Sequence, residues 1–247
     1  MTIDAMISVQ NYHKRYGDTL AVENLSFDVS AGSILGMLGP NGAGKTTTLR
    51  AIAGIIRPTG GHLRVDGRDV TSELVEAKQN IAFVPDDPQL FDLLTIWEHL
   101  EFIATAYRVA DYAERAEELL EQFEVTEKRD VAARELSRGM RQKVAISCAY
   151  LHRPSAILFD EPLTGLDPHG IRTLKDSIQQ QAAGGAAIVI SSHLLSLIED
   201  LCTHLLIIHR GRQLFCGTIG ETRKSHPDLQ GDASLEDTFF RTTEGNK

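Results

Sequence analysis

The sequence has few of the features that mark a membrane-spanning, disulfide-stabilised or nucleic-acid-binding chain. Its longest uninterrupted apolar stretches hold about five residues, whereas a membrane-spanning helix needs roughly 20. Its 3 cysteines form no C-x-x-C pair and therefore predict neither a disulfide framework nor a zinc site. The 34 acidic residues outnumber the 25 basic ones, and the net charge is -9. Because nucleic-acid binding needs a clustered basic face, we expect no nucleic-acid partner.

We also expect no secretory signal. Residues Met1 to Ile7 contain Asp4 and lack both the basic and the apolar segments of a signal peptide. The 247 residues suffice for one domain with a core of ordinary size, and they show no internal repeat. We therefore expect a single domain over residues 1–247 and a cytoplasmic location.

Apolar residues alternate with period two near the start of the chain, which predicts antiparallel strands. The alternation covers residues 7–9 and 25–29, with a turn near 16–18, and a further strand and turn follow at 63–67. From residue 155 onward, strands and helices instead alternate, which predicts a parallel sheet covered on both faces. The expected elements there are strands 156–159, 186–191 and 205–208, a helix opened by Asp167 and Pro168, and a helix around 194–201.

The middle of the chain contains a helical part and a strand–loop–helix unit. Residues 95–124 are acidic and have apolar residues on one helical stripe, so their glutamates are most simply a solvated face. An apolar strand at 34–38 precedes a Gly-rich loop and a short helix at 46–53, closed by Gly54.

The loop of this unit fits the phosphate-binding pattern G-x-x-x-x-G-K-[ST]. Its glycines let successive backbone N–H groups curve around a phosphate. Lys45 reaches the outer phosphates, and the Thr46 hydroxyl is a ligand for Mg²⁺. The sequence thus predicts a nucleotide-binding set that consists of Gly39, Pro40, Asn41, Gly42, Ala43, Gly44, Lys45, Thr46 and Thr47.

Two other interpretations of this loop are weaker. A Gly-rich turn that contains a lysine by chance would rarely lie between a strand and a helix. The spacing of Gly36, Gly39 and Gly42 also suggests a dinucleotide-binding loop, but no lysine belongs in that fingerprint.

An apolar strand at 157–159 ends in two acids, Asp160 and Glu161. A phosphate loop needs a carboxylate on a neighbouring strand to hold Mg²⁺, and Asp160 is placed to do so through water. Glu161 would then lie near the terminal phosphate, where a carboxylate orients or deprotonates the attacking water. The alternative is that both acids merely open a turn at Pro162, but the phosphate loop favours the functional interpretation.

With residues 136–142, Leu-Ser-Arg-Gly-Met-Arg-Gln, the sequence resembles the nucleotide-binding subunit of an ABC transporter over nearly its whole length. The segment looks like the family signature LSGGQ, with Arg138 and Met140 in place of the common Gly and Gln. The resemblance implies that two subunits pack head to tail. Ser137 and the Gly139 N–H of one subunit would then close on the γ-phosphate held by the other. Ser137 would equally be the N-cap of a helix at 140–150.

Three further positions match the family's pattern. Residues 165–167 resemble the D-loop at the dimer interface, although Asp167 alone would be a helix N-cap. His193 resembles the switch histidine that contacts the γ-phosphate, whereas most histidines lie on the surface or in the core. Tyr16 resembles the aromatic residue that stacks on adenine, whereas an isolated tyrosine in a hairpin more often serves packing.

One position departs from the family. Where a Gln commonly follows a strand like 81–85, this chain has Asp86, with Gln89 three residues later. A carboxylate is a hard oxygen ligand that suits Mg²⁺, so we expect Asp86 to take the sensing role in an altered form. The alternative is that Asp86 opens an acidic turn and Gln89 does the sensing.

The resemblance implies an α/β fold with three parts. These are a P-loop NTPase core with a parallel sheet flanked by helices, an antiparallel β-subdomain and a helical subdomain over about 90–150. A short C-terminal extension over about 218–247 would follow. ATP and Mg²⁺ are the expected ligands and ATP hydrolysis the expected reaction. The expected catalytic residues are Glu161 and His193, and the expected metal site consists of Thr46, Asp86 and Asp160.

The expected partners are transmembrane transporter subunits at the inner face of the membrane and a second ATPase subunit, identical or related. Segments 94–100 and 234–240 resemble the branch that serves exporters. The alternative is a soluble ABC-type ATPase without a membrane partner. Its translation-type members carry two domains and its repair-type members carry long coiled coils, which this sequence lacks. A P-loop kinase or GTPase would leave the segment 137–139 unexplained.

Overall fold

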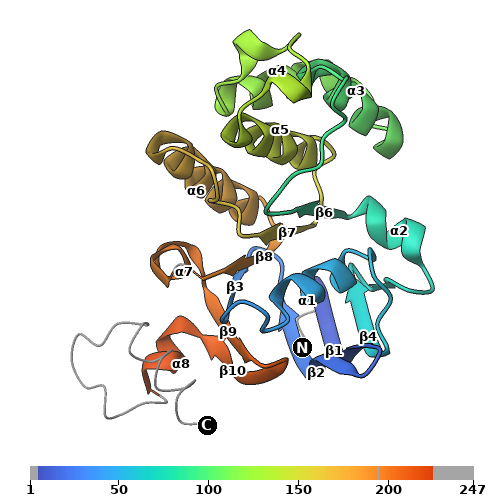
Figure 1. Cartoon of the computed structure of the whole chain (residues 1–247), viewed down its shortest axis with the longest axis vertical. Coiled ribbons are helices and arrows are strands. Elements are labelled where there is room, and N and C mark those ends of the chain that lie inside the picture. Colours follow the sequence, from blue (N-terminus) through green and yellow to red (C-terminus); the bar gives the residue numbers. More distant parts are fainter. Residues whose placement is uncertain (1–4, 194, 225–247) are drawn as a thin grey trace.

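The computed structural model describes residues 5–193 and 195–224, which form two sheets and the helices around them (Figure 1). The smaller sheet is antiparallel, in the order β2-β1-β4-β5. Tyr16 pairs with Thr19 across a two-residue turn, as the alternation of the sequence predicts. The strands of this sheet are β1 (Ile7–Tyr16), β2 (Thr19–Val29), β4 (Gly60–Val65) and β5 (Arg68–Asp69).

The larger sheet has six strands in the order β10-β9-β3-β8-β7-β6. All neighbouring pairs are parallel except β9 and β10, which form an antiparallel hairpin. The predicted parallel sheet is confirmed, whereas β10 was not foreseen because its residues alternate poorly between buried and exposed. The strands are β3 (Ile34–Leu38), β6 (Ile81–Val84), β7 (Ala156–Asp160), β8 (Ala187–Ser192), β9 (His204–His209) and β10 (Arg212–Thr218).

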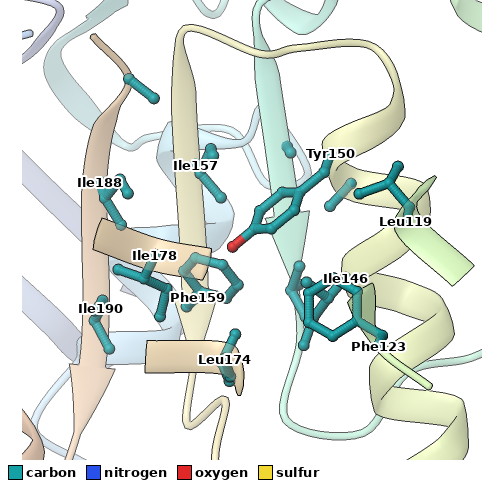
Figure 2. Packing of buried hydrophobic residues seen from close by; sticks show 14 of the residues in the cluster. Leu119, Phe123, Ile146, Tyr150, Ile157, Phe159, Leu174, Ile178, Ile188 and Ile190 are labelled. Carbon is teal, nitrogen blue, oxygen red and sulfur yellow. The ribbon is translucent and has the colours of Figure 1, made fainter. Parts of the chain in front are cut away.

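The two faces of this sheet belong to two separate apolar cores. On β7, Ile157 and Phe159 point to one core, and Ala156 and Leu158 point to the other. The first core lies against α3 to α7, as Figure 2 shows for Tyr150 standing beside Phe159. The second lies against α1 and the antiparallel sheet. The run of four apolar residues at 156–159 in this central strand is therefore explained by burial on both sides.

Helix α6 of the first core begins at a capping residue of the sequence. The Asp167 carboxylate accepts the Gly170 N–H at 2.6 Å, and Pro168 occupies the first turn of α6. The hydroxyl of buried Tyr150 lies 3.1 Å from that of Ser177 on α6, which satisfies its polar end inside the core. Outside the helical region described next, the helices are α1 (Lys45–Ile52), α2 (Leu74–Gln79), α6 (Pro168–Ala183), α7 (Leu195–Leu201) and α8 (Ile219–Lys224).

A helical region lies between β6 and β7 and forms the top of the view in Figure 1. Thr95 opens it with a capping box to Glu98. The helical stretch expected over 95–124 is broken in two, because Arg108 and Asp111 adopt left-handed backbone angles with φ of 55° and 50°. Its elements are α3 (Ile96–Tyr107), α4 (Tyr112–Gln122), the 3₁₀ turns η1 (Thr126–Lys128) and η2 (Ala133–Glu135), and α5 (Arg138–Leu151).

Within the described residues, every helix is too short or too polar to cross a bilayer. Of the C-terminal extension expected from about residue 218, the structure describes residues up to 224. The exporter-like segment 234–240 lies outside the described residues.

Candidate functional site

The carboxyl ends of three neighbouring parallel strands meet at one edge of the large sheet. Leu38 at the end of β3 pairs with Ser192 of β8, and Asp160 at the end of β7 pairs with Ser191. The loops that follow these strands are the phosphate loop, the segment at Glu161 and the segment at His193. Ligands of open α/β sheets bind at such an edge.

The phosphate loop has a backbone that glycine permits. Gly42 and Gly44 have φ of 79° and 105°, and a Cβ on Gly44 would lie 2.9 Å from the Ala21 carbonyl oxygen. Helix α1 starts at Lys45 directly after this turn. The first N–H groups of a helix have no partner within the helix, so this start is a binding place for an anion.

The loop borders a cavity of about 270 Å³. Nearly every residue predicted to bind nucleotide or metal at this end of the sheet is in its walls. The lining consists of Ala21, Pro40, Asn41, Gly42, Ala43, Gly44, Lys45, Thr46, Thr47, Asp86, Asp160 and Glu161.

Lys45 is a buried cation at the floor of the site. Its Nζ donates to the Gly39 carbonyl oxygen at 2.6 Å and lies 3.9 Å from Glu161 Oε1. Burial lowers the pKa of Lys45, and the negative charges of Glu161 and Asp160 oppose that shift. A cation that has lost part of its water gains the most from an arriving phosphate.

Thr46 and Asp160 form the set of oxygens that suits Mg²⁺. The Thr46 hydroxyl donates to Asp160 Oδ1 at 3.1 Å, and the Ser191 hydroxyl donates to the same oxygen at 2.5 Å. Mg²⁺ is usually held by one or two carboxylates, a hydroxyl and the phosphates of its nucleotide. A buried carboxylate beside a threonine hydroxyl and the phosphate loop therefore fits that ion.

Glu161 is held in an unusual backbone conformation, with φ of 48°. Its N–H donates to the Ser191 carbonyl at 3.0 Å, and its own carbonyl accepts the Thr164 hydroxyl at 3.0 Å. Its Oε2 lies 2.9 Å from His193 Nδ1. These contacts hold a strained residue so that its carboxylate points between Lys45 and His193, as expected of a side chain that positions water.

The signature residues lie apart from this cavity, at the start of α5. The Ser137 hydroxyl accepts the Met140 N–H at 3.3 Å, so the predicted N-cap is present. A Cβ on Gly139 would lie 2.6 Å from the Gly165 carbonyl oxygen. The glycine is therefore needed within the chain, because the D-loop segment packs directly on the helix start.

Asp86 and Gln89 are separated by the structure. Asp86 lines the cavity, whereas Gln89 donates to the Asp87 carboxylate at 2.9 Å and lines an apolar groove on the other side of the loop. Metal coordination by Asp86 stays a prediction, and its geometry is more favourable than that of Gln89.

Tyr16 lies outside the walls that the described residues give to this cavity. Its ring is about half exposed, and the Lys14 ammonium lies 4.8 Å from the ring centroid. Stacking of Tyr16 on adenine stays a prediction. The adenine would contact the exposed part of the ring.

Comparison with known proteins decides the family. The model of the ABC transporter family matches residues 22–164, which is more than half of the chain. The chain belongs to the ABC transporter family. It is 32% identical to the ABC-type transporter ATP-binding protein EcsA of Bacillus subtilis, over 97% of this chain and 97% of that protein. It is 36% identical to the Nod factor export ATP-binding protein I of Burkholderia orbicola, over 85% of this chain and 70% of that protein.

A solved structure of the ATP-binding subunit of an ABC transporter has the same fold. Its TM-score to this chain is 0.91 at 33% identity, and the match covers 96% of this chain and 99% of the other. The predicted P-loop fold is thus confirmed. As an ATP-binding subunit of the ABC family, the chain binds nucleotide and hydrolyses ATP to power transport.

The sequence left three features of this ABC site unforeseen. Ala21 comes from the antiparallel sheet, and Ser191 comes from a strand whose neighbour is known only once the strand order is known. The third is an ion pair between Arg138 and Asp86. The sequence did contain a signal for this ion pair. At these two positions it departs from the family's pattern, and the two replacing residues carry opposite charges.

Proposed function

We propose that this subunit hydrolyses Mg²⁺-bound ATP in a head-to-tail dimer and drives export through separate membrane subunits. The arrangement of Lys45, Asp160 and Glu161 around one cavity carries the proposal. Mg²⁺, when bound, would neutralise phosphate charge and would be held by Thr46 and Asp160, with Asp86 as a further ligand.

The residues of the chain have separate roles in the reaction. Lys45 and the N–H groups at the start of α1 bind the phosphates and stabilise the charge that spreads over them. Glu161 orients the attacking water and accepts its proton, and His193 holds the carboxylate at 2.9 Å and contacts the γ-phosphate.

The dimer is supported by the position of the signature. Ser137 and Gly139 lie at a helix start, a place that binds anions, yet both stand outside the cavity of their own chain. A second copy or a related subunit, packed head to tail, would give these residues a phosphate to bind. Closure of the dimer on two ATP molecules and its release after hydrolysis would supply the mechanical step.

A membrane partner is supported by an apolar groove of about 490 Å³. Phe91 and Phe102 meet edge to face in its wall with ring centroids 5.3 Å apart, and their exposed fractions are 56% and 49%. Such exposed aromatic surface is typical of a partner site. The groove and the ATP cavity share one loop, since Asp87 lines the groove and Asp86 lines the cavity. A short amphipathic helix of a membrane subunit would therefore touch the loop that borders the nucleotide, and this would place the subunit at the inner face of the membrane.

Co-purification from detergent-solubilised membranes tests the membrane partner. We expect a multispan protein to be recovered with the chain and to be lost from Phe102→Ser, while ATP binding is kept. Val75→Ser is the matched control, because Val75 is an exposed apolar residue, with 69% of its surface accessible, on α2 outside the groove. Absence of any membrane protein from the parental sample would favour a soluble ATPase instead, whereas equal loss with both variants would contradict the groove as the docking site.

A further inference from the structure

An ion pair connects the helical region to the edge of the ATP cavity. Arg138 Nη2 donates to Asp86 Oδ1 at 3.2 Å, although the two residues are 52 positions apart. Arg138 is the first residue of α5, and Asp86 lies in the loop after β6 and lines the cavity. Both side chains are about half exposed, so the pair is accessible to water, ions and nucleotide.

The stem of Arg138 also passes over the segment between β7 and α6. A Cβ on Gly165 would lie 3.1 Å from Cγ and Cδ of Arg138. The next residue, Gly139, packs on the Gly165 carbonyl oxygen. One side chain thus spans from the signature, across the D-loop segment, to a carboxylate that lines the ATP cavity.

We propose that Arg138 is a positioning residue that controls, through its ion pair, how strongly Asp86 attracts the Mg²⁺ of the nucleotide. Arg138 and Mg²⁺ would interact with the same Asp86 carboxylate, so the ion pair would weaken metal binding and metal binding would weaken the ion pair. This inference rests on the proposed role of Asp86 at the metal. It adds a link by which magnesium–nucleotide binding frees the start of α5.

The direction of the effect follows from charge. A guanidinium 3.2 Å from the carboxylate neutralises it and also repels an arriving cation. Removal of Arg138's charge should therefore increase the gain in nucleotide affinity that Mg²⁺ provides. Because exposed ion pairs are weak, we expect a change of about two- to fivefold.

The test compares the Kd of a fluorescent, slowly hydrolysed ATP analogue in Mg²⁺ and in EDTA, and takes the ratio of the two. This ratio separates the metal effect from general attraction of Arg138 for an anion. We expect Arg138→Gln to raise the ratio of EDTA to Mg²⁺ Kd about two- to fivefold. Arg138→Lys should return it toward the parental value, because the charge is restored. Arg141→Gln is the matched control, since Arg141 joins α5 to Asp92 by a 3.7 Å ion pair outside the ATP cavity.

The double variant decides whether the effect acts through Asp86. Asp86→Asn should lower the ratio, and Arg138→Gln should then add nothing to it. An equal effect of Arg138→Gln in both backgrounds, or an equal effect of Arg141→Gln, would overturn the inference. An unchanged ratio in Asp86→Asn would remove Asp86 from the metal site and the inference with it. A lowered ratio in Asp86→Asn, together with an unchanged ratio in the single Arg138→Gln variant, would overturn the inference and leave Asp86 at the metal site.

Discussion

The ATP cavity and the apolar groove share a loop but are built in opposite ways. The cavity draws nearly all its walls from the short segments 40–47 and 160–161. The groove draws its walls from positions spread between Arg50 and His152, on several helices and loops. Anion chemistry needs backbone N–H groups and charges held in fixed places, and a strand end followed by a helix start provides both. An apolar partner surface needs only side chains of the right kind on neighbouring helix faces.

The two sites also treat their ionisable groups differently. In the cavity, Lys45, Asp160 and Glu161 each have a polar partner within the chain. In the groove, the His152 ring stacks on Tyr107 with centroids 3.8 Å apart, and burial lowers its pKa to about 4. The cavity thus stabilises its charged groups, whereas burial at the groove disfavours the charged form of His152.

Removal of the cavity's cation should have the largest effect. Lys45→Ala removes the charge that faces the phosphates and should reduce ATP turnover by about 10³-fold or more, to background. Turnover by the purified variant measures this, and its thermal unfolding should show an intact fold. Lys143→Ala is the control. The Lys143 side chain is also largely buried and also forms an ion pair, with Glu124, but it lies outside the cavity. Parental turnover in Lys45→Ala would contradict the assignment of the phosphate loop.

The next largest effect should come from the carboxylate beside it. Glu161→Gln keeps the shape but removes the base, so hydrolysis should fall by about 10²-fold or more while ATP binding remains. A closed dimer with trapped nucleotide should then accumulate in size-exclusion chromatography with ATP. Hydrolysis at the parental rate would remove Glu161 from catalysis, and an inactive monomer would point to a different partner chain.

The shared loop offers a direct comparison of the two sites. Asp86 faces the cavity and Gln89 faces the groove, three residues apart. Asp86→Ala should raise the Mg²⁺ concentration for half-maximal ATP turnover by about tenfold, whereas Gln89→Ala should leave it nearly unchanged. The reverse ranking would transfer the sensing role to Gln89.

The smallest effect should be a pH dependence of stability from the groove. Because burial lowers the pKa of His152 to about 4, the unfolded chain binds a proton between about pH 6.5 and 4 and the folded chain does not. The free energy of unfolding should therefore fall as pH falls through this window. Since His152 is only partly buried, we expect a loss of about 1–2 kcal/mol relative to His152→Gln. Urea midpoints of both proteins at pH 7 and 4.5 measure it, and parallel changes in the two would assign the effect to other groups.

The features that could be predicted from the sequence are those formed by residues that are adjacent along the chain. The phosphate loop, its strand 34–38 and the acids at 160–161 could be located because the backbone turn, the lysine and the helix start are adjacent in sequence. Asp167 and Ser137 were predictable as N-caps for the same reason. Strand β10 was missed because this edge strand is exposed or only partly buried at every position, so no buried face imposes an apolar alternation on its sequence.

What depends on distant parts of the chain could not be predicted. Ser191 reaches Asp160 only because β8 lies next to β7, and strand order does not follow from local pattern. The break between α3 and α4 depends on Arg108 and Asp111, which adopt left-handed conformations. Residues other than glycine rarely adopt this conformation, so the sequence does not predict it. The break lets both helices pack on α5.

The sequence by itself determined the chemistry of this ABC subunit, because a phosphate loop and a paired acidic strand end are recorded in contiguous residues. Only the tertiary structure decided which of these residues lie together in one site. It placed Asp86 on the cavity and Gln89 on the groove, and it brought Arg138 to Asp86 across 52 positions. The physical reason is that local turns and caps depend on near neighbours, whereas ion pairs and grooves depend on how β6, α5 and the sheet pack.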